Sequence, residues 1–290
     1  MSGTIGAVRH TYQCPMRWAD LDALGHVNNV VYVDYLQEAR VDMLRTHGTS
    51  ARTDELAEGV VVVRHEVSYL APLTFGFDPV TIECWVTEIR AATFTLAYEV
   101  FHERGGERIV YLRAKTVLTP YVFATERPRR LTDAERASLS DYLEPAEPTD
   151  RVPLPTARPQ AAARYPVQVR FSDVDVYGHV NNVKYFEYLQ EARIHMVADV
   201  WKGLDPISIV VAQTDVDYRV PILFRPEPYD AWSWMVHVGN RSATIESLIV
   251  DGETVLARAR VVLVFFDQAT QRSAAPPEVY LERLRALLPS

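Results

Sequence analysis

The sequence predicts an α+β protein built from two tandem halves, each with an antiparallel sheet and one long helix. Three observations lead to this prediction. The decapeptide "DLDALGHVNN" at 20–29 recurs as "DVDVYGHVNN" at 173–182. A stretch with the periodicity of an amphipathic helix follows each copy. Beyond each helix, the hydrophobic pattern changes to the two-residue period of strands.

The repeat extends well beyond the decapeptide. Arg17 aligns with Arg170, and the match continues through "RWADLDALGHVNNVVYVDYLQEAR" and "RFSDVDVYGHVNNVKYFEYLQEAR". Further on, a difference in loop length brings Tyr69 opposite Tyr218. The repeat is far longer than the units of solenoid proteins, which have about 20 to 45 residues. It therefore indicates the duplication of a whole domain.

The helix after each decapeptide has one apolar stripe, made of Tyr32, Tyr35, Leu36, Ala39 and Met43 and, in the second copy, of Tyr185, Tyr188, Leu189, Ala192 and Met196. Asparagine is a favoured N-cap, so we expect Asn28 or Asn29 to begin the first helix. Glycine often ends a helix, and Gly48 and Gly203 are in the right places. This spacing predicts about 18 residues, or roughly 27 Å, for each helix.

Strand-like stretches fill the rest of each half. "VVVVRHEVSYLAP" at 60–72 is expected to place Val61, Val63, His65, Val67 and Tyr69 on one face of a strand. Several β-rich runs follow it, and the second half contains a matching series. Consecutive strands after a single helix are typical of an antiparallel sheet. Because one helix cannot cover both faces of a sheet, two halves joined edge to edge could form one continuous sheet.

A boundary separates the halves. "TDAE" at 132–135 has the spacing of a capping box and predicts a short helix that ends near Leu143. The next segment, "PAEPTDRVPLPTARP", is too rich in proline for a helix or a central strand. We therefore predict a first domain at 1–144, an extended linker at 145–160 and a second domain at 161–290, which ends in the helix of "PEVYLERLRALL".

Composition narrows the class of protein. The 290 residues are 48% hydrophobic and 23% charged, as in globular proteins. The formal net charge of −8 argues against a nucleic-acid or anionic membrane surface. The two cysteines, Cys14 and Cys84, do not support a disulfide framework. The sequence shows neither a signal-peptide pattern nor an apolar stretch of roughly 20 residues, so we expect a cytoplasmic protein without a membrane partner.

The duplicated motif, together with the β-rich stretch after each copy, resembles the hotdog-fold acyl-CoA thioesterases of the 4-hydroxybenzoyl-CoA thioesterase-like family. The resemblance implies a tandem (double) hotdog, in which each half is an antiparallel sheet wrapped around one long helix. It implies acyl-CoA or another acyl thioester as the substrate. In that family the second Asp of the Asp-x-Asp pair is the catalytic carboxylate, and this role maps onto Asp22 and Asp175.

One difference limits the comparison. Some members of the family carry Tyr-His where this chain has Asn28-Asn29 and Asn181-Asn182. Any role of that histidine therefore does not transfer to this chain.

The chemistry of the motif agrees with a thioesterase. Asp22 precedes a long helix, whose first N–H groups lack intrahelical acceptors and carry the positive end of the helix dipole. Such N–H groups can hold a thioester carbonyl oxygen and stabilise the oxyanion that forms from it. The carboxylate can attack the carbonyl carbon directly or polarise a water molecule that attacks it. Glycine allows a tight turn close to a ligand.

We therefore expect Asp22 and Asp175 to be catalytic. The candidate substrate-binding residues are Gly25, His26, Asn28, Asn29, Gly178, His179, Asn181 and Asn182.

Most of these residues also have an ordinary structural interpretation. Either aspartate could form an Asx turn or cap the helix. The two histidines could organise the loop, and the asparagines are expected to act first as caps. Asp20 and Asp173 are expected to be structural and to pair with Arg17 and Arg170. The tyrosines of the helix stripe are expected to be packing residues.

Two other functions remain open at this point: a non-catalytic binder of acyl thioesters, or a hotdog hydratase or dehydratase. We expect no metal and no organic cofactor, because the chain has no recognisable zinc-ligand spacing and no Gly-rich phosphate loop. From the resemblance we expect an internal pseudo-dimer of the two halves, which could associate further into a homo-oligomer. The length of the acyl chain, and CoA against acyl carrier protein, stay undecided.

Overall fold

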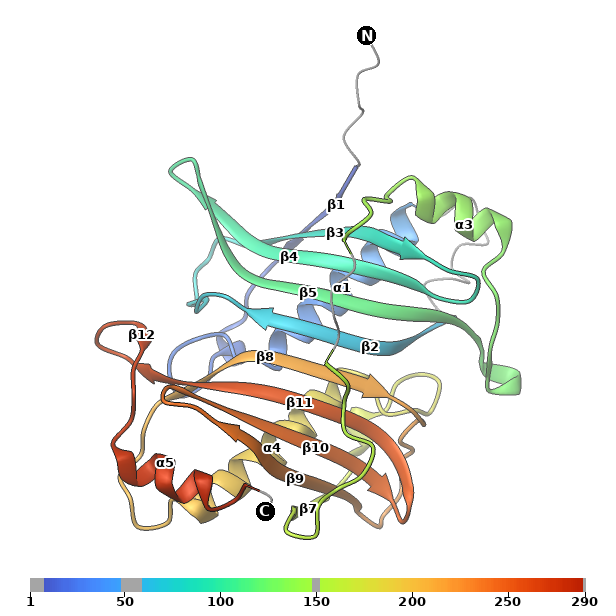
Figure 1. The fold of residues 1–290 in the computed structure, drawn as a ribbon. Helices are drawn as coiled ribbons and strands as arrows, with labels where there is room; N and C mark the ends of the chain where they lie inside the picture. Colours follow the sequence, from blue (N-terminus) through green and yellow to red (C-terminus); the bar gives the residue numbers. More distant parts are fainter. Residues whose placement is uncertain (1–7, 48–58, 148–151, 289–290) are drawn as a thin grey trace. The chain divides into compact units, whose positions relative to one another are not determined.

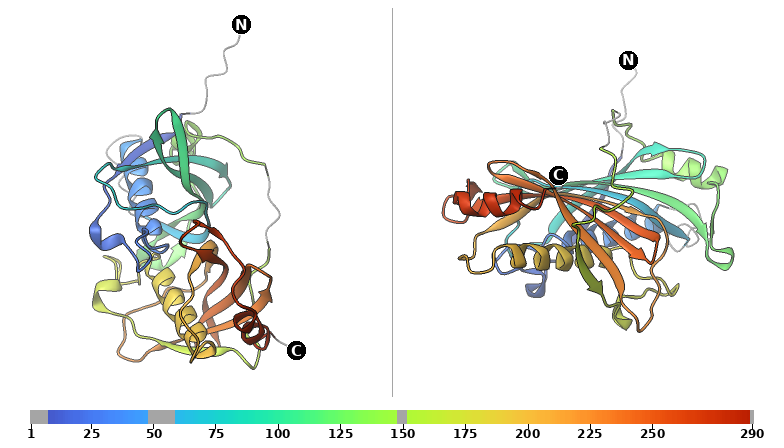
Figure 2. Two further views of the ribbon diagram at one scale, coloured as in Figure 1. Left: turned by 90° about the vertical axis from the view of Figure 1, so that its left-hand side faces the viewer. Right: turned by 60° about the horizontal axis from the view of Figure 1, so that its bottom comes forward.

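The computed structural model describes residues 8–47, 59–147 and 152–288 and divides the chain into two compact units, Met1–Arg151 and Val152–Ser290 (Figure 1). The division lies within the predicted linker. Each unit contains one long helix and one antiparallel sheet, so the predicted α+β class is confirmed. Figures 1 and 2 show each long helix lying along one face of the sheet of its own unit.

In unit 1 every strand pairing is antiparallel. The strands lie in the order β1 (His10–Cys14), β3 (Val80–Ile89), β4 (Phe94–Arg104), β5 (Glu107–Val122) and β2 (Val60–Tyr69), and the short β6 (Arg127–Pro128) pairs with β5.

Unit 2 repeats this arrangement, again with antiparallel pairings. Its strands lie in the order β7 (Ala163–Val167), β9 (Tyr229–Val238), β10 (Ser242–Asp251), β11 (Thr254–Asp267) and β8 (Ile209–Tyr218), with the short β12 (Arg272–Ser273) beside β11. The duplication therefore includes the topology of the sheet and not only the motif.

The long helices are α1 (Val31–Thr46) and α4 (Lys184–Val200), with 16 and 17 residues. The expectation that an asparagine is the N-cap was wrong, because Val30 and Val183 occupy that position. Asn28 lies two residues before the N-cap Val30. Oδ1 of Asn28 accepts the N–H of Val30 at 3.3 Å, so it still satisfies a free donor at the start of the helix.

Gly48 and Gly203 were expected to end the two long helices. Gly48 lies outside the described residues. The helix α4 ends before Gly203, with Trp201 as its C-cap. Gly203 has a φ of 83°, so it serves a later turn of the chain and not the end of the helix.

The cores lie between each helix and its sheet. Among the large side chains that are fully buried in unit 1 are Leu36, Met43, Ile82, Leu96 and Leu112. The core of unit 2 includes Met196, Met235, Ile245, Val261 and Leu281.

The strand β2 departs from the predicted pattern. A register shift between Val62 and Arg64 marks an irregularity at Val63, so the alternation of faces is interrupted there. Of the five residues expected on one face, only His65 and Val67 are buried. A single-residue bulge cannot be read from the hydrophobic pattern.

Shorter helices complete the units. The predicted capping box opens α3 (Asp133–Ser140), where the N–H of Glu135 donates to the Thr132 hydroxyl at 3.2 Å and the N–H of Thr132 donates to Glu135 at 2.8 Å. The chain then continues to Leu143, which forms a bridge with Val86. Unit 2 ends in the predicted terminal helix, α5 (Glu278–Arg285). The 3-10 turns are η1 (Trp18–Asp20), η2 (Phe123–Thr125) and η3 (Phe171–Asp173).

The described part of the Pro-rich segment packs against unit 2. Leu154 is buried, and the carbonyl of Pro153 accepts a hydrogen bond from the Arg260 guanidinium at 2.9 Å. The guanidinium of Arg158 lies 3.8 Å from the centre of the Trp232 ring. From Val152 onward, the predicted linker is therefore an extended segment that packs against unit 2.

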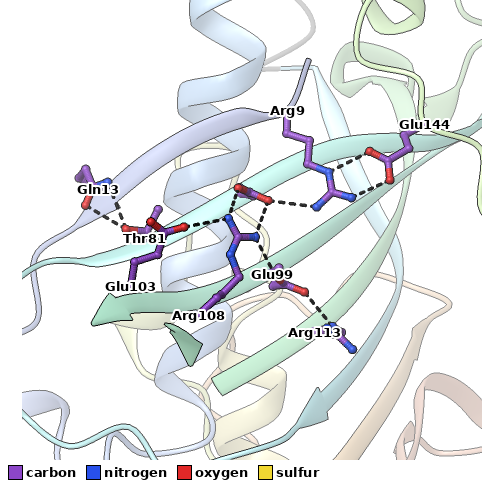
Figure 3. A network of polar contacts seen from close by, with 9 residues as sticks. Arg9, Gln13, Thr81, Glu99, Glu103, Arg108, Arg113 and Glu144 are labelled. Carbon is purple, nitrogen blue, oxygen red and sulfur yellow. Dashed lines mark hydrogen bonds and ion pairs between the residues drawn. The ribbon is translucent and has the colours of Figure 1, made fainter. Parts of the chain in front are cut away.

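A network of ion pairs connects Arg9, the residue before β1, with β3, β4 and β5 in unit 1 (Figure 3). Arg9 bonds to Glu144 at 2.6 Å and to Glu83 at 3.0 Å, and Arg108 bonds to Glu83 at 2.7 Å and to Glu99 at 3.0 Å. The hydrogen bond from Arg108, followed by that from Arg9, lowers the pKa of Glu83 although its burial opposes this. The network fastens the segment after α3 to the first strand.

Among the described ranges, no helix is both long enough and apolar enough to span a membrane.

Candidate functional site

Each decapeptide folds into a closed loop between a 3-10 turn and the long helix. In unit 1 the carbonyl of Asp20 accepts the N–H of Asn28 at 2.8 Å, and in unit 2 the carbonyl of Asp173 accepts the N–H of Asn181 at 2.8 Å. The loop ends are thus joined by the same main-chain bond in both units. This closure brings the acidic start of the motif next to the first turn of the helix.

Asp22 lies inside the loop and is partly exposed. Its Oδ1 accepts the N–H groups of Leu24 at 2.8 Å and His26 at 3.2 Å, and its own N–H donates to the His26 carbonyl at 2.8 Å. This is the Asx turn of the structural interpretation. The second oxygen, Oδ2, has no hydrogen-bond partner among residues 8–47, 59–147 and 152–288.

Asp175 repeats this geometry. Its Oδ1 accepts the N–H groups of Tyr177 at 2.9 Å and His179 at 3.3 Å, and its N–H donates to the His179 carbonyl at 2.8 Å. The loop therefore fixes the direction of each carboxylate through one of its oxygens.

The glycines provide the turn that the sequence predicts. Gly25 has a φ of 75° and Gly178 a φ of 82°, a left-handed conformation that other residues rarely adopt. Their N–H groups donate to the carbonyls of Asp22 at 3.0 Å and Asp175 at 3.1 Å.

The histidines organise the loop through their main chains. Besides the bonds to the aspartates, His26 forms an isolated bridge with Thr74, and His179 forms one with Leu223. His26 is buried, whereas His179 is partly exposed. Each loop is therefore paired to the segment that follows the first strand after the helix.

The asparagines set the geometry of the helix N-terminus. The carbonyl of Asn28 accepts the N–H of Val31 at 2.9 Å. Because the C=O and N–H of one peptide point in opposite directions, the N–H of Asn29 is directed away from the helix. In the described part of the chain no acceptor meets this N–H. In unit 2 the Asn181 carbonyl is held in the same way, by the N–H of Lys184 at 2.9 Å.

A tyrosine fixes the next peptide. The hydroxyl of Tyr69 on β2 donates to the carbonyl of Asn29 at 2.9 Å, and that of Tyr218 on β8 donates to the carbonyl of Asn182 at 2.9 Å.

The first aspartate of each motif is almost fully buried, as expected of a structural residue. Asp20 is 2% exposed, and its carboxylate accepts the backbone N–H of Arg17 at 2.8 Å and the Nε–H of Arg17 at 3.0 Å. The predicted pairing with Arg17 is confirmed. Asp173 is 3% exposed and accepts the backbone N–H of Arg170 at 2.9 Å.

The helix tyrosines, which the sequence predicted to be packing residues, also donate hydrogen bonds. The Tyr35 hydroxyl donates to the carboxylate of Asp20, and the Tyr188 hydroxyl donates to that of Asp173 at 2.7 Å. Burial and the hydrogen bond to Asp20 raise the pKa of Tyr35 far above its ordinary value, so it stays a proton donor. The spacing from Asp20 to Tyr35 equals that from Asp173 to Tyr188, and this was the feature of the sequence that could have indicated the contact.

In unit 2 the other tyrosine of the stripe contacts the segment that pairs with the loop. The Tyr185 hydroxyl accepts the N–H of Ile222 at 2.9 Å, and the rings of Tyr185 and Tyr218 make an edge contact at 5.0 Å. Tyr32 and Tyr69 make the matching contact at 5.7 Å in unit 1.

In the ranges that the structure describes, no group of three or more His, Cys, Asp or Glu side chains is arranged to hold a metal ion.

Comparisons with known proteins agree with the duplication. The model of the thioesterase-like superfamily matches residues 16–155 and again residues 169–284. Long-chain acyl-CoA thioesterase FadM of Escherichia coli is 28% identical over 129 residues, which are 42% of this chain and 96% of that protein.

Solved structures show the same fold over both units. A putative oleoyl thioesterase from Lactobacillus plantarum superposes with a TM-score of 0.73 at 16% identity, covering 91% of this chain and 98% of that one. The 12:0-ACP thioesterase from Umbellularia californica gives a TM-score of 0.72 at 19% identity, covering 88% and 93%. At these identities the likeness concerns the fold.

The repeated fold and the repeated match to one family model show two tandem hotdog units, as the sequence predicts. The chain belongs to the thioesterase-like superfamily, whose model covers most of it.

Proposed function

We propose that the protein is an acyl-CoA thioesterase, which hydrolyses an acyl thioester to a free acid and a thiol in each half. One observation carries this proposal. In both loops an aspartate is held by two main-chain N–H groups on one oxygen, and the loop leads into the N-terminus of a long helix. FadM, which matches part of this chain, is named as acting on long-chain acyl-CoA, and this supports the choice of substrate.

In the proposed mechanism the aspartate acts through its second oxygen. Oδ1 of Asp22 is occupied by Leu24 and His26, so Oδ2 is the oxygen available for chemistry. It attacks the thioester carbonyl carbon to give a mixed anhydride, which water then hydrolyses to the free acid and the restored carboxylate, or it accepts a proton from a water molecule that attacks the same carbon. Either route expels a thiolate, which is a good leaving group and needs no strong general acid. Asp175 has the same role in unit 2.

The carbonyl oxygen of the substrate needs donors where negative charge develops. The N–H of Asn29 is the donor we assign in unit 1, because it points away from the helix and lies at the positive end of the helix dipole. The peptide N–H of Asn182 has the corresponding role in unit 2. Such a donor typically contributes a factor of about 100 to 1,000 in rate.

The remaining predicted binding residues shape this site. Gly25 and Gly178 give the substrate close access to the main chain, since a residue without Cβ presents no bulk there. His26 and His179 hold the loop closed, and Asn28 and Asn181 fix the first peptide of the helix.

Exposed aromatic residues border both loops and fit an apolar acyl group. Trp18 is 75% exposed, and its ring contacts that of Phe75 at 5.6 Å, while Phe171 is 83% exposed and contacts Phe224 at 6.0 Å. Phe75 follows Thr74, the residue that bridges His26. An exposed apolar border of this kind is a suitable contact for the hydrocarbon part of an acyl thioester.

The Asx turn of each aspartate also favours a second candidate, a non-catalytic binder in which the carboxylate only closes the loop. Release of free thiol from a panel of acyl-CoA and acyl carrier protein substrates separates the two functions. We expect the wild-type protein to release thiol, and the double variant Asp22→Asn, Asp175→Asn to lose about 100-fold or more of this rate.

The control is Asp199→Asn, an exposed position at the end of α4 with the same change of charge. It should retain the wild-type rate. Absence of thiol release from every substrate supports the binder. A double variant with wild-type turnover and unchanged thermal stability shows that the assignment of the aspartates is wrong.

A further inference from the structure

Two tyrosines in the second turn of the long helices reach the buried carboxylates that precede the catalytic candidates. We propose that Tyr35 and Tyr188 are positioning residues: they set the spacing between the helix N-terminus and the loop that carries Asp22 or Asp175. This inference rests on the proposed function, because it assigns the tyrosines a role in that same site.

Asp20 connects the helix with both ends of the loop. Its carboxylate accepts the Tyr35 hydroxyl and the backbone N–H of Arg17, at the start of the 3-10 turn. Its main-chain carbonyl accepts the N–H of Asn28 at 2.8 Å, at the far end of the loop. A displacement of Asp20 therefore moves Asn28, whose carbonyl in turn determines where the N–H of Asn29 points.

The same chain of contacts exists in unit 2. The Tyr188 hydroxyl donates to Asp173 at 2.7 Å, and the carbonyl of Asp173 accepts the N–H of Asn181 at 2.8 Å. The exposed residues of these loops differ, with Ala23 in one and Val176 in the other. The Asp–Tyr contact has thus stayed the same while neighbouring side chains changed.

The hydroxyl is needed because Asp20 has almost no access to water. A carboxylate that is 2% exposed depends on protein donors, and losing one leaves a costly unsatisfied charge. Burial and the hydrogen bond to Asp20 raise the pKa of Tyr35, so the hydroxyl keeps its proton at neutral pH. Replacing Tyr35 by Phe preserves the packing of the ring and removes only the donor, so Asp20 must shift toward other donors.

A purely structural role would lower stability without a selective effect on one site. The two sites allow this alternative to be tested within one chain. In an Asp175→Asn background only the first site turns over, and in an Asp22→Asn background only the second does. Tyr98→Phe is the matched control, because Tyr98 is a buried tyrosine on the strand β4 and not on the long helix that follows the motif.

Thiol release from one acyl-CoA, chosen as the best substrate of the wild-type enzyme, is measured with Tyr35→Phe in the Asp175→Asn background. We expect kcat to fall about 10- to 100-fold with KM changed less than threefold, since a small misplacement of reacting groups mainly costs rate. Tyr188→Phe should do the same in the Asp22→Asn background. Tyr98→Phe should leave kcat of both backgrounds unchanged.

Two results overturn the inference. One is an unchanged kcat for Tyr35→Phe and Tyr188→Phe in their backgrounds. The other is an equal loss of kcat in Tyr98→Phe, which would indicate a general loss of stability. Thermal unfolding of every variant confirms that each is folded at the assay temperature. If the wild-type enzyme releases no thiol while it folds normally, the proposed function fails instead, and this outcome differs from an active enzyme that is insensitive to Tyr35→Phe.

Discussion

Nδ1 of His10 lies 2.8 Å from Nε2 of His47, so the two imidazoles share one hydrogen bond at the C-terminal end of α1. His10 is 6% exposed on β1, and its Nε2 lies 3.0 Å from the Asp42 carboxylate. An N–H···N bond requires one of the two facing nitrogens to be unprotonated. Burial and then the neighbouring His47 lower the pKa of His10, and Asp42 offsets only part of this effect.

This arrangement predicts a loss of stability in weak acid. Below pH 6.5, the ordinary pKa of histidine, His10 binds a proton in the unfolded chain more readily than in the folded protein. The contribution of neutral His10 to the free energy of unfolding is therefore fully present above about pH 6.5. It declines as the pH falls from there toward the lowered pKa of His10. We expect the free energy of unfolding, measured with urea at pH 7.5 and 5.5, to decrease less in His10→Gln than in the wild type. His237→Gln, at an exposed histidine, should behave as the wild type. Equal pH dependence in His10→Gln would contradict this account.

The loop glycines should not tolerate a side chain. At the positive φ of Gly25 and Gly178, an L-residue costs about 1 to 2 kcal/mol although no neighbouring atom lies within 4 Å of the added Cβ. We expect Gly25→Ala to destabilise unit 1 by this amount in urea unfolding and to reduce thiol release. Gly76→Ala is the control, because its Cβ meets only Met16 Cε at an ordinary 3.8 Å and its φ is not positive. If both variants are equally stable, the turn does not depend on glycine.

Activity should not depend on a metal ion. The sequence lacks zinc-ligand spacing, and the proposed chemistry uses only a carboxylate and main-chain N–H groups. We expect thiol release to be unchanged after dialysis against EDTA. Loss of activity that one divalent ion specifically restores would show that the site needs a metal. Unfolding curves before and after dialysis reveal whether an ion acts on the fold instead.

The two units should depend on each other. The sequence predicts an internal pseudo-dimer with joined sheets, and an isolated unit would then expose an unpaired strand edge, which promotes aggregation. We expect residues 1–151, produced alone, to be insoluble or to form homodimers that replace the missing partner. Size-exclusion chromatography with light scattering measures this. A monomeric, folded and fully active first unit would show that the two units work independently.

The fold was predictable because it depends on patterns that repeat. The decapeptide, the helix stripe and the strand periodicity occur twice, so each half supported the interpretation of the other. The capping box at Thr132 was predictable for a different reason, since it depends only on residues three apart. Details that depend on a single residue of register, such as the irregularity at Val63, were not predictable.

The residues of the candidate site were predictable from the sequence, but the hydrogen bond by which the helix holds the loop was not. The position of Asp22 before the helix follows from the motif, and so does the turn at Gly25. The hydroxyl of Tyr35 joins residues that are distant in sequence, and an apolar stripe gives no sign that one of its members also donates a hydrogen bond. The helix start was misplaced because Asn28 caps a turn that precedes the helix.

Because the loops are held by their main chains, the side chains at their tips were able to diverge after the duplication. The donors to the aspartates are the backbone N–H groups of Leu24 in one loop and Tyr177 in the other, and such groups survive nearly any substitution. Ala23 and Leu24 have become Val176 and Tyr177, and Val176 is 93% exposed. A substitution at one tip can therefore change the side chain that this loop exposes, while the main-chain hydrogen bonds to its aspartate stay in place.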